Sequence, residues 1–148
     1  MSDPLRDLTS SLDLLRWIGW AHAQAGQEWI RARELSRQQA FTLGYLEQNP
    51  GAIQRELAQV SRTTPASVSS LLRGLETRGL IERRSVDGDE RSKRVYATSA
   101  GSALIAGFDS AMAAAGETIL EPLTPDERDT LQSLLLKITA ELPKPTRS

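Results

Sequence analysis

The sequence predicts a mainly α-helical fold with one small antiparallel β-hairpin. Over most of the 148 residues, apolar side chains recur at intervals of three or four, which places them on one face of a helix. Only residues 80–86 and 92–98 alternate as short strands do, and the turn signal Asp87-Gly88 lies between them. A chain of this length is one domain, or one domain with appended helices, and can bury a core.

The first predicted helix runs from about Ser10 to Ala32 and is apolar on more than one side. A helix of this kind must bury both sides. One side could therefore pack on its own domain and the other on a partner subunit. The apolar residues are Leu12, Leu14, Leu15, Trp17, Ile18, Trp20, Ala21, Ala25 and Trp29.

A second and a third helix follow. Ser36 and Gln39 have the spacing of a capping box, and the second helix runs to about Gln48, before the turn signal Asn49-Pro50-Gly51. The third helix is short, and residues 61–63 form the turn after it. Its apolar face consists of Ile53, Leu57 and Val60.

The fourth helix has clear signals at both ends. Thr64 is its cap, Pro65 takes the first helical position, and Gly79 ends it. One face carries the apolar residues Val68, Leu71, Leu72 and Leu75. At 100° per residue, the opposite face carries Ala66, Ser70, Arg73 and Thr77, flanked by Ser67 and Ser69.

Two helices complete the chain after the hairpin. Thr98 caps a single fifth helix that Pro122 ends, and Thr124 forms a second capping box with Glu127. Their apolar residues are Leu104, Ile105, Phe108, Met112, Ala115 and Ile119 in the fifth helix, and Leu131, Leu134, Leu135, Ile138 and Leu142 in the sixth.

Composition argues against several classes of function. The chain has no cysteine and one histidine, which excludes disulfides and thiol chemistry and argues against a zinc site. No nucleophile–base motif surrounds the serines or the carboxylates, so we expect no enzyme, no metal and no cofactor. No apolar run approaches the roughly 20 residues of a membrane span, and no signal peptide opens the chain. We therefore expect a soluble cytoplasmic protein without a membrane partner.

The distribution of charge is more informative than the net charge of −1. Residues 53–94 contain nine Arg and Lys against six Asp and Glu, a local net charge of +3, so the rest of the chain carries −4. A basic segment on an acidic body is compatible with nucleic-acid binding.

The fourth helix suits the major groove of DNA because its outer side chains are small enough to let it approach the base edges. Backbone N–H groups at its start favour a phosphate, and an arginine further along could reach a guanine or the backbone. The alternative is an ordinary solvated face. The candidate DNA contacts on this helix are Thr63, Thr64, Ala66, Ser67, Ser69, Ser70 and Arg73.

The hairpin adds five cations: Arg83, Arg84, Arg91, Lys93 and Arg94. An arginine at a hairpin tip has the right shape for a minor groove, and Asp89 could brace it. The alternative is an ion-paired hairpin, because four carboxylates nearly balance these charges. The candidate DNA contacts here are Arg84, Asp89, Arg91 and Lys93.

The order and spacing of these elements resemble the multiple-antibiotic-resistance regulator (MarR) family of bacterial winged-helix repressors. The likeness covers roughly residues 10–142, and residues 75–101 are its specific part. The matching residues are Glu56-Leu57-Ala58, Ser67-Val68-Ser69-Ser70-Leu71, Leu75-Glu76-x-x-Gly79-Leu80-Ile81-Glu82-Arg83-Arg84, Asp89-x-Arg91-x-Lys93-Arg94-Val95-Tyr96-Ala97-Thr98 and Gly101.

The resemblance implies a winged helix–turn–helix lobe at residues 35–98 and dimerisation helices at 1–34 and 99–148. It implies a homodimer on an inverted-repeat, palindromic operator in double-stranded DNA, with residues 64–79 in the major groove and Arg91 in the minor groove. The chain departs from the family at Ser61-Arg62, where an apolar residue and a glycine are common. It also departs at Ala97, Ser70 and Gly74, where leucine, arginine and arginine are frequent.

The resemblance also implies a small aromatic effector between the dimer helices and the DNA-binding lobe. Candidate ligand contacts are Trp17, Trp20, His22, Phe41 and Tyr45, with Trp29 beside them. The alternative is that these aromatic residues pack in the core or at the dimer interface. A second alternative for the whole chain is a winged helix that binds a protein partner without sequence-specific DNA binding.

Overall fold

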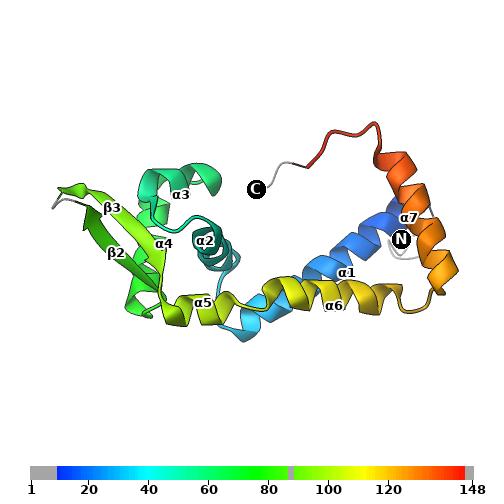
Figure 1. Cartoon of the computed structure of the whole chain (residues 1–148), viewed down its shortest axis with the longest axis horizontal. Helices are drawn as coiled ribbons and strands as arrows, with labels where there is room; N and C mark the ends of the chain where they lie inside the picture. The colour runs from blue at the N-terminus through cyan, green and yellow to red at the C-terminus, as the bar shows by residue number, and fades with distance from the viewer. Residues whose placement is uncertain (1–9, 87–88, 146–148) are drawn as a thin grey trace, which may run out of the picture. The chain divides into compact units, whose positions relative to one another are not determined.

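The computed structural model describes residues 10–86 and 89–145, with the backbone alone for residues 86 and 89–92. It confirms a mainly helical chain with a small antiparallel sheet (Figure 1). In order, the elements are α1 (Ser11–Ala32), α2 (Arg37–Gln48), β1 (Ala52–Ile53), α3 (Gln54–Val60), α4 (Pro65–Thr77), β2 (Ile81–Val86), β3 (Asp89–Ala97), α5 (Ser99–Ile105), α6 (Phe108–Leu120) and α7 (Pro125–Thr139).

The helix starts predicted from hydroxyl side chains are confirmed. The side chains of Ser36, Thr64, Thr98 and Thr124 each accept a hydrogen bond from the backbone N–H three residues later. Capping boxes form at Ser36 and at Thr124, each with the side chain three residues later. Because these caps are local, the sequence placed the starts of the helices that they begin.

Residues 28–108 form one compact unit, and the core of the described chain lies within it. Helix α4 packs on α3, and the sheet has the order β1-β3-β2 with antiparallel neighbours. Arg83 and Ala52 both pair with Val95, which places that residue at the centre of the sheet. The largest fully buried side chains are Leu43, Leu46, Leu57, Val68, Leu72, Leu75, Ile81 and Val95.

Strand β1 was not predicted, and the role expected of Ile53 was wrong. Ile53 lies in β1 opposite Arg94, in extended backbone just before α3, and its side chain is exposed. The pairing with β3 draws this residue out of the helix. The apolar face of α3 therefore rests on Leu57 and Ala58, which are buried.

The hairpin strands pair in the predicted antiparallel sense. Strand β3 begins at Asp89, earlier than the expected residue 92. The ladder is irregular between Ser85, which pairs with Lys93, and Val86, which pairs with Asp89. The predicted turn at Asp87-Gly88 lies outside the described residues.

The single fifth helix expected up to Pro122 is wrong, because the chain breaks into α5 and α6. Ala106 is extended, with φ −60° and ψ 139°, and Gly107 has φ +88°. A positive φ is accessible to glycine without steric cost, so Gly107 permits the break. The heptad-like spacing of apolar residues continues across it and gave no sign of the interruption.

The expectation about apolar runs also needs correction. Among the described residues, the segment Ser99–Leu120 is long and apolar enough to cross a membrane by length and composition. Its backbone is interrupted between α5 and α6. A bilayer interior offers no hydrogen-bond partners for backbone groups freed by such a break.

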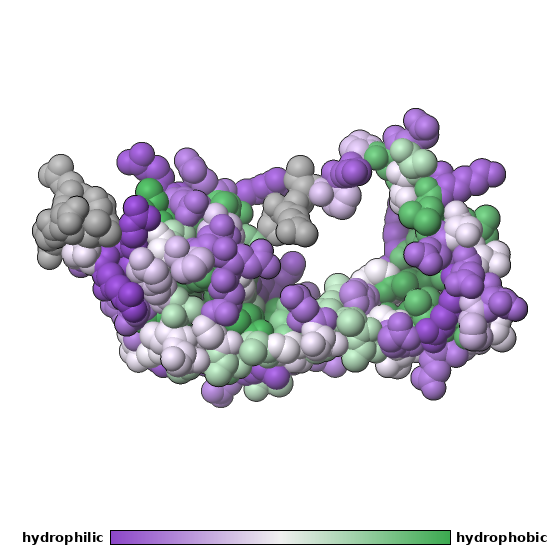
Figure 2. Space-filling model, in the orientation of Figure 1, coloured by the Kyte–Doolittle hydropathy of each residue, from purple (hydrophilic) through white to green (hydrophobic). Residues whose placement is uncertain are grey.

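The second unit consists of residues 1–27 and 109–147. His22 Nε2 lies 2.9 Å from the backbone oxygen of Met112, and an Arg128 guanidinium nitrogen lies 2.7 Å from a Glu117 carboxylate oxygen. Within the described part of this unit only Gly26 is buried. Many of its large apolar side chains therefore remain at the surface, as the green patches over α7 in Figure 2 show.

Arg62 gives a stability prediction. It has φ +52° in the turn between α3 and α4, a conformation that costs an L-residue roughly 1–2 kcal/mol. Arg62→Gly removes this strain, and the extra freedom of glycine in the unfolded chain offsets about 0.5–1 kcal/mol of the gain. We expect the free energy of unfolding in urea to rise by up to about 1 kcal/mol. A clear loss of stability would show that the arginine side chain makes contacts that outweigh the strain.

Candidate nucleic-acid interface

Helix α4 presents one apolar and one polar face. Val68, Leu72 and Leu75 are fully buried against the core, which fixes the rotation of the helix about its axis. The outer residues Thr64, Ala66, Ser67, Ser70 and Arg73 are exposed, while Thr63 and Ser69 are half-buried at its margins. The predicted contact face of this helix is therefore open to solvent. Apart from Arg73, its side chains are small.

The start of α4 holds a pair of linked hydroxyls. Thr64 Oγ1 accepts a hydrogen bond from the Ser67 backbone N–H at 3.1 Å and donates one to Ser67 Oγ at 2.9 Å. Because Ser67 Oγ accepts from Thr64, its own hydrogen remains available for another acceptor. A phosphate oxygen at the helix start is such an acceptor, and the free N–H groups of the first turn also favour it.

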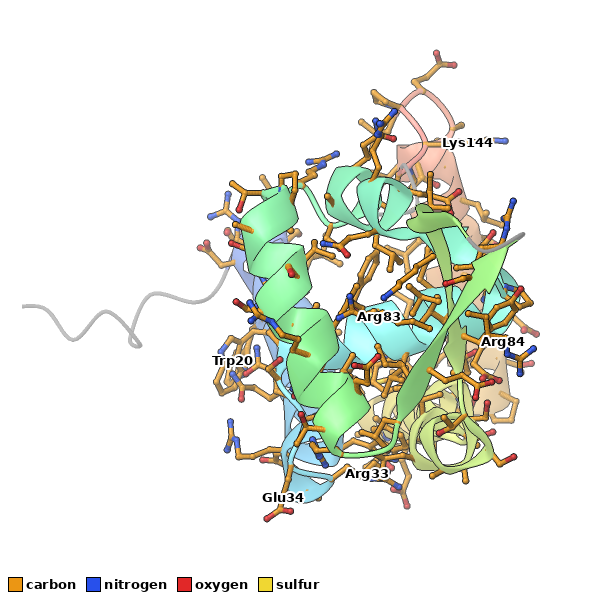
Figure 3. All side chains as sticks on the ribbon, turned by 90° about the vertical axis from the view of Figure 1, so that its left-hand side faces the viewer. Trp20, Arg33, Glu34, Arg83, Arg84 and Lys144 are labelled. Atoms are coloured by element: carbon orange, nitrogen blue, oxygen red, sulfur yellow. The ribbon has the colours of Figure 1, made fainter. Side chains whose placement is uncertain are left out.

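The arginines of β2 point to opposite sides of the hairpin, and Figure 3 shows Arg83 turned toward α4 and Arg84 turned away. The Arg83 side chain is 17% exposed, and its Nε lies 3.2 Å from a carboxylate oxygen of Glu76 on α4. It therefore ties the hairpin to α4. Arg84 stacks on the Tyr96 ring at 4.6 Å and pairs with Glu82.

The two cations of β3 that the structure describes differ in role. Arg94 donates from Nη1 to the backbone oxygen of Gly51 at 3.1 Å, which fixes it against the turn before β1. Lys93 is exposed. The side chains of Asp89 and Arg91 lie outside the described residues, so their roles stay predictions.

Two residues outside the predicted DNA contacts, Arg78 and Thr98, anchor the end of α4. Arg78 Nη1 donates to the backbone oxygen of Glu34 at 2.7 Å, and Nη2 donates to that of Arg33 at 3.2 Å. Thr98 Oγ1 donates to the backbone oxygen of Gly79 at 2.6 Å. Backbone acceptors leave no trace in side-chain patterns, so the sequence offered no signal for either contact.

The proposed ligand contacts divide between the two units. Trp17, Trp20 and His22 belong to the unit of residues 1–27 and 109–147, and both tryptophans are exposed. Phe41 and Tyr45 belong to the other unit. Both lie in α2, and their rings stack on each other with centroids 6.3 Å apart.

The Tyr45 phenol already has a partner. Burial, and then the charge of Glu56 and a hydrogen bond to that carboxylate, raise the pKa of Tyr45 above its ordinary value of 10.0. Tyr45 lies on α2 and Glu56 on α3. The role of Tyr45 in ligand binding stays a prediction.

Known proteins are similar to this chain in both sequence and fold. Residues 34–92 match the MarR family. An uncharacterized HTH-type transcriptional regulator of Bacillus subtilis, YybA, is 26% identical over 85% of this chain and 86% of its own length. The HTH-type transcriptional repressor Rv2887 of Mycobacterium tuberculosis is 29% identical over 67% of this chain and 71% of its own.

Solved structures extend the match to nearly the whole chain. The MepR–DNA complex of Staphylococcus aureus is 30% identical, with a TM-score of 0.73 over 88% of this chain and 98% of that one. A putative MarR family transcriptional regulator from Clostridium acetobutylicum is 34% identical, with a TM-score of 0.73 over 87% of this chain and 95% of that one. The chain thus has the winged helix–turn–helix fold, and it belongs to the MarR family of DNA-binding transcriptional regulators.

Proposed function

We propose that this regulator is a repressor that binds an inverted-repeat operator as a homodimer. Helix α4 enters the major groove, and Arg91 enters the adjacent minor groove. The observation that carries the proposal is the outer face of α4: it is exposed, made of small and hydroxyl side chains, and held in one rotation by three buried residues. The name of the M. tuberculosis relative supports repression.

The helices outside the lobe support a dimer. Most large apolar residues of α1 and α7 are exposed, among them Trp20, Leu134 and Ile138, and the described part of their unit has no apolar core. Helices with unburied apolar faces are stable only when another surface covers them. A second copy also doubles the base contacts, on half-sites about 10 bp or roughly 34 Å apart.

We infer a small aromatic effector that releases the operator. MepR has been solved with ethidium bromide, an aromatic cation, and Trp17 and Trp20 are exposed aromatic side chains on α1. The two tryptophans and His22 form one set of candidate contacts, and Phe41 and Tyr45 form the other. We place such a regulator in the cytoplasm, where the DNA that it binds is present.

The experiment is selection of bound sites from random DNA, followed by affinity titration at two salt concentrations. A DNA-binding dimer should enrich an inverted repeat, and its affinity should fall steeply with salt because several phosphate contacts release counterions. Absent or salt-insensitive binding would favour a winged helix that binds a protein partner.

Arg91→Ala tests the wing. We expect operator affinity to fall tenfold or more, since one groove contact is worth about 1–3 kcal/mol, while the melting temperature stays unchanged. Arg16→Ala on α1 is the control, because it removes the same charge from a side chain that is 81% exposed. Equal affinity of the Arg91 variant and the wild type would refute the wing assignment.

A further inference from the structure

Hydrogen bonds join the C-terminal end of α4 to the turn after α1 and to the start of α5, whereas the hydrogen bonds at its N-terminal end are mostly local. At the N-terminal end, Thr64 bonds to Ser67 within the same turn, and Gln54 reaches the Pro65 backbone oxygen at 3.4 Å. At the C-terminal end, Arg78 reaches the chain that follows α1, and Thr98 joins Gly79 to the start of α5. Side-chain hydrogen bonds to other parts of the fold are thus concentrated at the C-terminal end of α4, while the burial of Val68, Leu72 and Leu75 fixes its rotation.

The two backbone carbonyls that Arg78 contacts suit a guanidinium group. Glu34 has φ +56°, and the backbone N–H of Leu35 bonds back to the oxygen of Ile30 at 3.2 Å, so the chain turns sharply after α1. This turn presents the carbonyls of Arg33 and Glu34 together, beneath the end of α4 in Figure 3. The planar fork of arginine can bond both carbonyls at once, which a single ammonium does less well.

The carbonyls that Arg78 contacts are themselves held in place. The Arg33 guanidinium lies 3.3 Å from the Trp29 ring centre and donates to the Trp29 backbone oxygen at 3.0 Å. Trp29 meets Phe108 edge to face, with centroids 5.3 Å apart. Phe108 directly follows Gly107, where α5 and α6 separate. Contacts therefore run from the joint between α5 and α6 to the end of α4.

We propose that Arg78 is a positioning residue for DNA recognition: it fixes the tilt of α4 relative to the end of α1. The inference rests on the proposed function, in which α4 reads the major groove. Helix α4 has 13 residues, so it is about 20 Å long. A small rotation about its C-terminal end displaces the N-terminal turn by a large fraction of an ångström. Hydrogen bonds to base edges do not tolerate that displacement.

Arg78→Met tests the proposal, because methionine keeps much of the apolar stem and removes the donors. We expect operator affinity to fall about five- to tenfold, the scale of one ordinary hydrogen bond in a protein. The slope of log operator affinity against log salt concentration should stay unchanged, because the Arg78 guanidinium donates to backbone carbonyls and not to phosphates. A reduced slope would show a phosphate contact and overturn the proposal, as would unchanged affinity.

Glu34 supplies the partner variants. Glu34→Val disfavours the positive φ and should displace the carbonyls that Arg78 contacts, whereas Glu34→Gly keeps the turn. We expect Glu34→Val to lower affinity as Arg78→Met does, and the double variant to be no weaker than either single one. Additive losses would overturn the proposal. Affinities are compared at a temperature where circular dichroism shows each variant folded, with Arg78→Lys replacing the methionine if that variant unfolds.

If the wild type selects no operator, the proposed function fails. If the wild type binds its operator and Arg78→Met binds it equally well, the positioning role alone fails.

Discussion

Replacing Gly101 with alanine should destabilise the DNA-binding lobe by about 3 kcal/mol or more, at or beyond the upper end of typical overpacking effects. A Cβ at this position would lie 2.0 Å from the backbone oxygen of Leu80 and 3.3 Å from Leu43 Cδ2. The Leu80 carbonyl cannot retreat freely, because it also accepts the Thr98 backbone N–H at 3.0 Å. The new Cβ therefore meets backbone and not a flexible side chain, so either α5 or the residues just before β2 must shift.

Urea unfolding followed by circular dichroism measures this effect, and Gly44→Ala on α2 is the matched control. A Cβ at Gly44 meets nothing within 4 Å, so alanine should raise stability by roughly 0.5–1 kcal/mol, the usual cost of glycine inside a helix. Operator affinity of Gly101→Ala should fall as well, because Thr98 ties α5 to the end of α4. Wild-type stability of the Gly101 variant would contradict the close approach.

Local chemistry explains which parts of the fold were predictable. A capping hydroxyl such as Ser36 or Thr124 acts within three residues of itself, so the sequence alone places the helix start. The same holds for Pro65 and for Gly79, which has φ +72° after α4.

The errors arise where a distant segment decides the local structure. Ile53 fits the apolar period of α3, but pairing with Arg94, about forty residues later, makes it a strand residue. The apolar period likewise continues through Gly107, although the backbone there is not helical. The spacing of apolar residues predicts which side chains are buried. It does not predict where the helical hydrogen bonds are interrupted.

For the candidate site, the sequence likewise predicted local features but not contacts between distant segments. The outer face of α4 followed from counting 100° per residue, since Val68, Leu72 and Leu75 are buried as expected. The alternation of a strand does separate Arg83 from Arg84, yet only the fold shows that Glu76 lies on the inner side. Arg78 was not predictable, because its partners are carbonyls more than forty residues away.

A charge placed on the exposed apolar face of α7 should separate the dimer. Leu134 and Ile138 lie one turn apart on the same face, and they are 55% and 58% exposed in the single chain. Full burial of such a side chain contributes about 1.5–3 kcal/mol. Four half-covered copies in a dimer therefore contribute roughly 3–6 kcal/mol, and Leu134→Asp with Ile138→Asp should weaken dimerisation at least about 100-fold.

Sedimentation at several protein concentrations measures the dimer, and Gln132→Asp with Ser133→Asp is the matched control. Both control residues are exposed on α7, and the paired changes add the same charge to the same helix. The control should remain dimeric and bind its operator normally. The Leu134 and Ile138 variant should lose operator affinity along with dimerisation, because a monomer meets only one half-site. If this variant stays dimeric, α7 does not form the interface, and the apolar residues of α1 must provide it instead.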